Sequence, residues 1–168
     1  MTKLLLLSDS HGDQAAVERV LAKETDAEVL IFLGDGDEDM EKAVQALKLD
    51  LPTHIVRGNC DYGSHAPTEE VLYSEGFFLL LTHGHLHHVG HSGHVDDLRR
   101  YALRKQCDIA LYGHSHCPDA DEKPGWPSLY NPGSIGRPRG DNGPTYGVLL
   151  LERGEKPRFQ LCPVPPKA

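Results

Sequence analysis

The stretch KLLLLSDSHGDQAAVERVLAKE, residues 3–24, decides the fold class of this chain. Its first six residues contain four consecutive leucines, a pattern typical of a short strand that is buried on both faces. Asp13 then stands where its side chain can cap a helix. The apolar residues that follow it have helical spacing: Ala16, Val17, Val20 and Leu21. The stretch therefore predicts a strand, a loop and a helix.

The same alternation recurs in the next part of the chain. Residues 28–33 repeat the buried-strand pattern, and residues 54–57 predict a third strand. Between them lies a second helical pattern with one apolar face, formed by Met40, Ala43, Val44 and Leu47. Strands that alternate with helices predict an α/β fold with a parallel sheet.

The pattern changes in the second half. Residues 70–74 and 77–82 predict a hairpin, and residues 108–112 predict a further strand. Residues 92–105 predict a helix with four inward-facing side chains, Val95, Leu98, Ala102 and Leu103. From residue 117 onward, Pro and Gly separate three short segments: SLYNPGS (128–134), TYGVLLLE (145–152) and RFQLC (158–162). We expect these to form a second, mostly antiparallel sheet, and we expect one domain over residues 1–168.

Charge and composition exclude several classes of protein. The formal net charge of -8 argues against an extended nucleic-acid footprint, which usually needs a basic face. The run from Leu4 to Leu7 is too short for a signal-peptide core or a membrane span, so we expect a cytoplasmic protein with no membrane partner. Four irregularly spaced cysteines without a Cys-x-x-Cys pair predict free thiols. The oligomeric state stays open, a homo-oligomer included.

Polar side chains follow five of the predicted strands at the points where the strands end. In open α/β sheets ligands bind outside the carboxyl ends of the strands, so these side chains should meet in one crevice. The residues concerned are Asp9, His11, Asp35, Asn59, His83, His114 and His116.

This set of side chains predicts a metal centre. Carboxylate, imidazole and amide donors without thiolate suit Mn²⁺, Fe, Zn²⁺ or Ni²⁺, of which Mn²⁺ is our expectation. Seven ligands are too many for one ion, whereas two ions that share one aspartate and one hydroxide would use them all. Such two-metal centres, with ions roughly 3.5–4 Å apart, stabilise the attacking and leaving oxygens of phosphoryl displacement.

Five motifs in order, DSH, GDGDED, GNCD, THGH and GHSH, resemble the calcineurin-like metallophosphoesterase superfamily. The segment NPGS at 131–134 is similar to its small bacterial and archaeal phosphodiesterase branch. The resemblance implies a four-layer α/β/β/α sandwich of two mixed sheets flanked by helices. It also implies two ligand sets that share Asp35: Asp9, His11, Asp35 and His116 for the first ion, and Asp35, Asn59, His83 and His114 for the second.

Three residues are candidates for contact with the substrate. We expect His85 to contact a metal ligand or the substrate phosphate. Asn59 and Cys60 are expected to contact the substrate as well. Many relatives that act as phosphatases carry histidine where this chain has Cys60, and a thiol is a poorer acid toward the leaving group. We therefore expect a metal-dependent phosphodiesterase that uses a bridging hydroxide on a small diester. The alternatives are a phosphomonoester or protein phosphatase, and a non-catalytic scaffold that binds partner proteins.

Other polar residues have simpler interpretations. We expect the acids after the second strand to complement the start of a helix: Asp37, Glu38, Asp39 and Glu41. Four further histidines are expected to be solvated loop residues, with an adventitious metal as the alternative: His87, His88, His91 and His94. Arg137 and Arg139 can reach a phosphate or lie in a solvated loop, and the pattern favours the loop.

Overall fold

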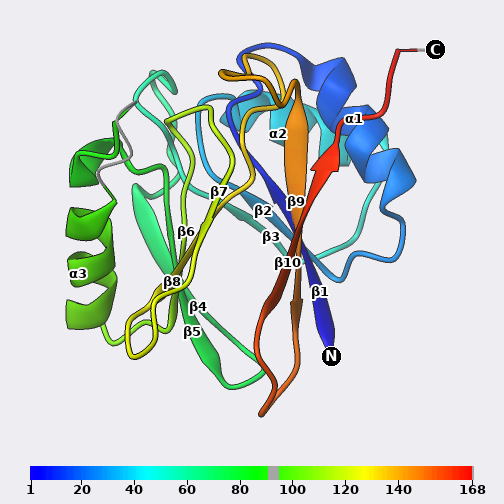
Figure 1. The fold of residues 1–168 in the computed structure, drawn as a ribbon. Helices are drawn as coiled ribbons and strands as arrows, with labels where there is room; N and C mark the ends of the chain where they lie inside the picture. Colours follow the sequence, from blue (N-terminus) through cyan, green and yellow to red (C-terminus); the bar gives the residue numbers. More distant parts are fainter. Residues whose placement is uncertain (91–94, 168) are drawn as a thin grey trace.

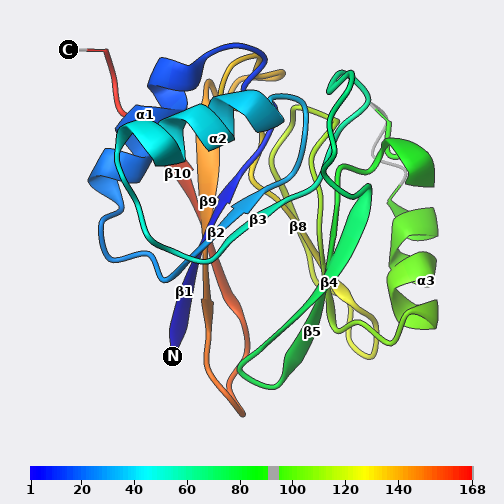
Figure 2. The same ribbon diagram turned by 180° about the vertical axis from the view of Figure 1, so that it is seen from behind.

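The computed structural model describes residues 1–90 and 95–167. Two five-stranded sheets face each other, and helices lie on their outer faces (Figures 1 and 2). Helices α1 (Gln14–Lys23) and α2 (Asp37–Ala46) cover the first sheet, and α3 (Asp96–Arg104) covers the second. The predicted four-layer sandwich of two mixed sheets is confirmed.

The first sheet has the order β10-β9-β1-β2-β3. Its strands are β1 (Thr2–Leu7), β2 (Val29–Phe32), β3 (Thr53–Ile55), β9 (Thr145–Leu151) and β10 (Arg158–Pro163). The first three run parallel, so their carboxyl ends point the same way, while β9 runs antiparallel to both β1 and β10.

The second sheet has the order β4-β5-β6-β8-β7. Its strands are β4 (Glu69–Ser74), β5 (Phe77–Thr82), β6 (Ile109–Leu111), β7 (Asp119–Asp121) and β8 (Ser128–Asn131). The hairpin of β4 and β5 is confirmed, and β5, β6 and β8 are parallel to one another. A short 3-10 helix, η1 (His85–His87), follows β5.

The expected assignment of the last segments to one antiparallel sheet is wrong. Strand β8 joins the second sheet in parallel with β6, whereas β9 and β10 extend the first sheet. The physical reason lies in β9, in which six of seven residues are buried. A strand that is buried on both faces needs a central place, and β9 has one between β1 and β10.

The leucines of β1 are divided between two cores. Leu5 and Leu7 pack with α1 and α2, and Leu4 and Leu6 pack in the space between the sheets. All four are fully buried, and each contributes about 1.5–3 kcal/mol. Burial on both faces explains why residues 4–7 contain no polar side chain.

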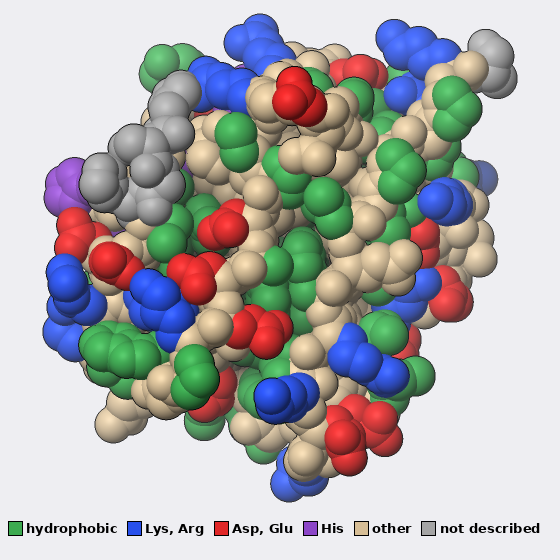
Figure 3. All heavy atoms as spheres, in the orientation of Figure 1, with side chains coloured by type: hydrophobic (Ala, Val, Ile, Leu, Met, Phe, Trp, Pro, Cys, Tyr) green, Lys and Arg blue, Asp and Glu red, His purple; other side chains and the backbone are tan. Residues whose placement is uncertain are grey.

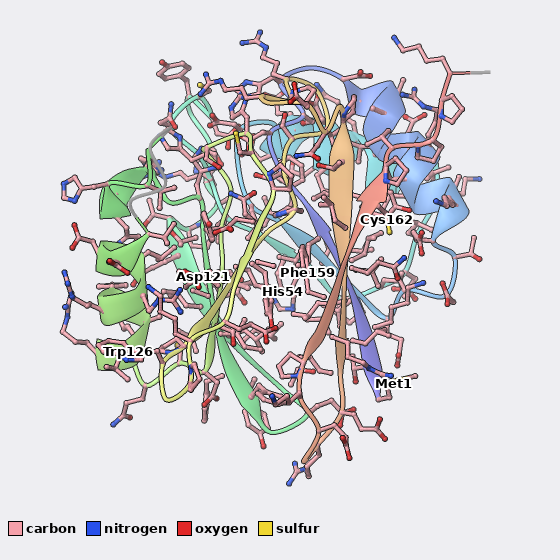
Figure 4. All side chains as sticks on the ribbon, viewed as in Figure 1. Met1, His54, Asp121, Trp126, Phe159 and Cys162 are labelled. Carbon is pink, nitrogen blue, oxygen red and sulfur yellow. The ribbon has the colours of Figure 1, made fainter. Side chains whose placement is uncertain are left out.

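Two side-chain contacts join the two sheets. His54 on β3 lies 2.7 Å from a carboxylate oxygen of Glu70 on β4. On the opposite side, Phe159 of β10 stacks on Tyr130 of β8 with ring centroids 4.9 Å apart. Figure 4 shows His54 and Phe159 in the layer between the sheets. These contacts fix how the carboxyl ends of the two sheets face each other.

Two helices differ in detail from the expectation. In α3 the first residues of the predicted span, 92–94, lie outside the described residues, and Leu103 is 48% exposed instead of inward-facing. Arg99 takes a buried place in α3 because Asp121 of β7 pairs with its guanidinium. In α2, Leu47 follows the last turn and is 36% exposed. In α1, the cap is confirmed, since Asp13 accepts the N–H of Ala16 at 3.0 Å.

Candidate metal centre

The carboxyl ends of strands from both sheets supply the site. Asp9 and His11 follow β1, Asp35 follows β2, His83 follows β5, and His114 and His116 follow β6. Within the described residues, their side chains form two groups in which all donor atoms lie within 4.8 Å of one another. The groups are Asp9, His11, Asp35 and His116, and Asp35, His83 and His114.

Donor atoms within the groups are close. Nε2 of His116 lies 3.1 Å from Oδ1 of Asp9, and Nε2 of His11 lies 3.2 Å from Nε2 of His116. In the second group, Nε2 of His83 lies 3.3 Å from Oδ2 of Asp35. Asp35 belongs to both groups, and its Oδ2 also lies 3.7 Å from Nε2 of His11.

Backbone carbonyls fix the orientation of two imidazoles. Nδ1 of His83 donates to the Leu33 carbonyl at 2.6 Å, and Nδ1 of His116 donates to the Arg137 carbonyl at the same distance. In the neutral form of each ring, which carries one proton, these bonds leave Nε2 with a free lone pair. Metal-bound histidines in proteins are oriented in this way by their second nitrogen.

Asp9 carries the clearest sign that this site fits a cation. Its Oδ2 accepts hydrogen bonds from the Ser8 hydroxyl at 2.5 Å and from the His114 backbone N–H at 3.1 Å. Its Oδ1 is buried and has no hydrogen-bond partner among the described residues. Burial opposes ionisation, but His11, His116 and His83 outweigh it and hold the pKa of Asp9 well below its usual range. A divalent cation would compensate this buried charge, so the side chains present fit the metal.

Asp35 and His114 are also in the protonation state that binds metal. Burial would raise the pKa of Asp35, but hydrogen bonding and the charge of His83 lower it to about 2. Burial, together with the charge of His83, lowers the pKa of His114 to about 4. At neutral pH the carboxylate is therefore ionised and the imidazole of His114 is neutral.

The backbone of the site is strained. Nine non-glycine residues of the described chain have positive φ, and five of them are candidate ligands: Asp9, His11, Asp35, His114 and His116. A left-handed backbone costs roughly 1–3 kcal/mol per residue and persists only where the surroundings enforce it. The concentration of this strain at the ligands indicates a functional site.

Asp61 is a residue that the sequence pattern did not reveal. Its carboxylate accepts backbone N–H groups of Asp35, Gly36 and Gly58 at 2.7–2.8 Å, and that of Asp37 at 3.3 Å. It thereby joins the loop after β2 to the loop after β3. Asp61 is the fourth residue of the motif GNCD, but the motif alone does not indicate that its carboxylate accepts four backbone N–H groups.

Two residues of the NPGS segment also position the site. Ser134 donates its hydroxyl hydrogen to the Asp9 carbonyl at 2.8 Å. The side-chain amide of Asn131 donates to the Gly113 carbonyl at 3.1 Å and to the Ser115 hydroxyl at 3.0 Å. The segment, first noted only as a family feature, thus ties the loops after β1 and β6 to each other.

Asn59, Cys60 and His85 lie around the two groups. Asn59 is exposed at the rim, and its side-chain amide is 3.4 Å from the sulfur of Cys60. The backbone N–H of Cys60 donates to Asp35 at 2.8 Å, and burial followed by the Asp35 charge raises the pKa of its thiol. The ring of His85 lies 5.4 Å from that of His83, and burial lowers the pKa of His85. All three side chains are placed beside the candidate ligands.

The remaining acids and histidines have separate outcomes. Asp37, Glu38 and Asp39 occupy the first turn of α2 as expected, and Asp39 also accepts the Ser10 hydroxyl at 2.6 Å. The expectation of a solvated His87 is wrong, because its ring is largely buried 4.3 Å from that of Tyr101, centroid to centroid. His88 is exposed as expected. His91 and His94 lie outside the described residues.

Comparison with known proteins identifies the family. The profile of the calcineurin-like phosphoesterase superfamily domain matches residues 2–154. The chain belongs to this superfamily. It is a metal-dependent phosphoesterase, as the motifs predicted. It is similar to the probable metallophosphoesterase YsnB of Bacillus subtilis, with 33% identity over 149 residues that cover 89% of this chain and 84% of the relative. Phosphodiesterase YfcE of Escherichia coli is 34% identical over 172 residues, covering 89% and 88%.

Solved structures agree with this assignment. The structure of YfcE superposes with a TM-score of 0.64 at 30% identity and covers 88% of both chains. A predicted phosphoesterase of Streptococcus pneumoniae gives a TM-score of 0.73 at 24% identity, covering 96% of this chain and 98% of the other. Zinc-bound Vps29 of Entamoeba histolytica gives 0.74 at 20% identity with the same coverage, which shows a shared fold alone. No helix in the described part of this chain has the length and apolar character needed to span a membrane.

Proposed function

We propose that this protein hydrolyses a small phosphodiester at a dinuclear metal centre. Asp9, His11, Asp35 and His116 would hold one ion, and Asp35, Asn59, His83 and His114 would hold the other. The observation that carries the proposal is the pair of ligand groups sharing Asp35, beside a buried Asp9 oxygen without a partner. The donor set favours Mn²⁺, with Fe, Zn²⁺ and Ni²⁺ as alternatives.

Two bound ions would supply the charge that neutralises the phosphate and the bridging hydroxide that attacks it in line. The protein's part is to hold the donor atoms in place before the substrate arrives. The Leu33 and Arg137 carbonyls keep the His83 and His116 rings oriented, and Asp61 joins the loops that carry Asp35 and Asn59. Such preorganisation supports catalysis because little reorganisation is needed during the reaction.

His85, Asn59 and Cys60 would contact the phosphate. Since burial lowers the pKa of His85, its ring is neutral at neutral pH and offers one N–H to a phosphate oxygen. The backbone N–H of Cys60 donates to Asp35, so the Cys60 side chain starts beside a candidate metal ligand.

Two observations support a diester over a monoester. The relative YfcE, 34% identical, is named a phosphodiesterase. Cys60 also gives little proton transfer to a poor leaving group, which a phosphatase acting on alkyl monoesters needs. A scaffold without catalysis would not require six converging metal donors or strained ligand backbones, so the geometry disfavours that alternative.

The test combines metal content with a substrate pair. Protein stripped with a chelator and reloaded with Mn²⁺, Zn²⁺ or Ni²⁺ should bind about two ions per chain, measured by elemental analysis. Bis(4-nitrophenyl) phosphate should be hydrolysed best with Mn²⁺ and faster than 4-nitrophenyl phosphate. A metal content that stays at zero or one, or a consistent preference for the monoester, would refute the proposal.

A further inference from the structure

The candidate metal centre opens into two adjoining cavities of opposite charge. Both are lined by His11, Asp35 and Cys60, so the ligand groups lie where the cavities meet. The first, of about 390 Å³, continues over Arg137 and Arg139. Apart from Asp35, no carboxylate lines it among the described residues. We call it the arginine cavity.

The second cavity, of about 290 Å³, is acidic. Beyond Asp35 it is lined by Asp37, Glu38, Asp39 and Asp61, and no Lys or Arg of the described chain lines it. The carboxylates of Asp39 and Asp61 accept backbone N–H groups, which hold these side chains in place. We call it the acidic cavity.

The backbone of the arginine cavity is attached to a candidate ligand. The Arg137 carbonyl accepts the Nδ1 hydrogen of His116 at 2.6 Å, and the N–H of Arg139 donates to the His116 carbonyl at 3.0 Å. The N–H of Arg137 also donates to Ser134 at 2.8 Å. The side chains of Arg137 and Arg139 therefore start from fixed backbone positions beside His116. Figure 3 shows Lys and Arg side chains at the end of the molecule where the loop between β8 and β9 lies.

We infer that the substrate is an unsymmetrical phosphodiester with one arm that carries a further phosphate or carboxylate, and that Arg137 and Arg139 determine this specificity. The inference rests on the proposed diesterase function and names its substrate class. The anionic arm lies in the arginine cavity, and an arm without negative charge lies in the acidic cavity.

The charges select this orientation in two ways. A guanidinium binds phosphate or carboxylate through paired N–H donors, which a neutral arm cannot use. The reverse orientation would bring an anionic arm against four carboxylates, and this repulsion excludes it. A cavity of about 390 Å³ is also within the usual size range of small-ligand sites.

Two nucleotide esters test the inference directly. Thymidine 3′-(4-nitrophenyl phosphate) and its 5′-phosphorylated form have the same scissile bond and leaving group, and differ only in the additional phosphate. We expect the wild-type protein loaded with Mn²⁺ to show a kcat/KM about tenfold higher for the phosphorylated ester. Arg137→Ala should bring this ratio close to one, and Arg137→Lys should keep part of it because the charge remains without the paired donors.

Control variants show whether a change in the kcat/KM ratio comes from the arginine cavity or from any loss of positive charge. The backbone bonds of residue 137 do not depend on its side chain, so Arg137→Ala keeps the contacts to His116 and Ser134. Arg139→Ala should also lower the ratio. Arg100→Ala removes the same charge from the exposed face of α3, where Arg100 lies 3.3 Å from Asp97, and should leave the ratio unchanged.

Equilibrium binding gives a second, independent readout. By titration calorimetry, thymidine 3′,5′-bisphosphate should bind the wild-type protein about tenfold more tightly than thymidine 3′-monophosphate, and higher salt should reduce the difference. A ratio near one in both assays for the wild-type protein, or equal ratios in wild type and Arg137→Ala, would overturn the inference. Loss of hydrolysis of both esters with two metals bound would instead refute the proposed diesterase function.

Discussion

Asp61 offers the sharpest test of how the site is held together. Its Oδ2 accepts the N–H groups of Asp35 and Gly58 at 2.8 and 2.7 Å, and its Oδ1 accepts that of Gly36 at 2.7 Å. Asp61→Ala removes both acceptors at once. The loops after β2 and β3 then lose the side chain that joins them, and these loops carry Asp35 and Asn59.

The expected loss of stability follows from these bonds. A hydrogen bond to a charged group contributes about 1.5–3 kcal/mol when it is shielded from water. Asp61 is half-buried, so water can replace part of the three short bonds. We therefore expect Asp61→Ala to lower the free energy of unfolding by about 2–4 kcal/mol. Asp61→Asn should lose nearly as much, because either orientation of the amide turns its NH₂ group toward backbone N–H donors.

Urea unfolding of the metal-free protein measures this effect without the contribution of bound ions. Asp50→Ala is the matched control, since Asp50 is an exposed carboxylate, and its unfolding free energy should stay within about 0.5 kcal/mol of wild type. The affinity for Mn²⁺ should also fall in both Asp61 variants, measured by calorimetry. Wild-type stability and wild-type Mn²⁺ affinity in Asp61→Asn would show that the four bonds do not organise the loops.

Two further predictions concern the ligands and their packing. Asp35→Ala should reduce the metal content by at least one ion per chain, measured by elemental analysis. Asp37→Ala loses a hydrogen bond to the Glu38 N–H and should still bind two ions. Equal losses of metal in the two variants would mean that the wrong acid was assigned as a ligand. Gly113→Ala should destabilise the protein by about 1–3 kcal/mol in urea unfolding, because the added Cβ would overlap the Ser8 hydroxyl; an unchanged midpoint would contradict this close approach.

The sequence predicted those elements of the fold whose burial shows in the spacing of apolar residues. Leu4 to Leu7 and the helical spacing after Asp13 report burial directly, and α1 follows β1 as expected. Periodicity does not report which sheet a buried strand joins. Residues 145–151 are apolar enough for a central strand in either sheet, and only the pairing with β1 decides their place.

The candidate ligands could be predicted because each lies in the loop after a predicted strand. The residues that position these ligands could not be predicted, because they act through hydrogen bonds to backbone groups. Asp61 binds four N–H groups, and Ser134 binds the Asp9 carbonyl, but no spacing of side chains reveals such partners. The prediction of a solvated His87 was wrong for a related reason. Its burial depends on Tyr101, fourteen positions later in the sequence.

Cys60 decides whether the protein itself contributes acid catalysis. Its backbone N–H donates to Asp35 and survives any side-chain change, while the exposed thiol accepts the Asn59 amide at 3.4 Å. Burial and the Asp35 charge raise the pKa of the thiol, so we expect it to keep its proton and not to act as a thiolate nucleophile. Cys60→Ala should therefore retain hydrolysis of bis(4-nitrophenyl) phosphate within about threefold, because nitrophenolate leaves without a proton.

Cys60→His should show the opposite dependence on the leaving group. Positioned proton transfer contributes roughly 10²–10⁴-fold, so even a poorly placed imidazole should raise the rate on alkyl esters by about tenfold and leave nitrophenyl esters nearly unchanged. This gain needs the imidazolium form, so the alkyl-ester rate of the variant should fall as pH rises through the pKa of the new histidine. If Cys60→Ala instead abolishes turnover of bis(4-nitrophenyl) phosphate while two metal ions stay bound, the thiol takes part in the reaction, and the metals and their ligands are not sufficient for diester hydrolysis.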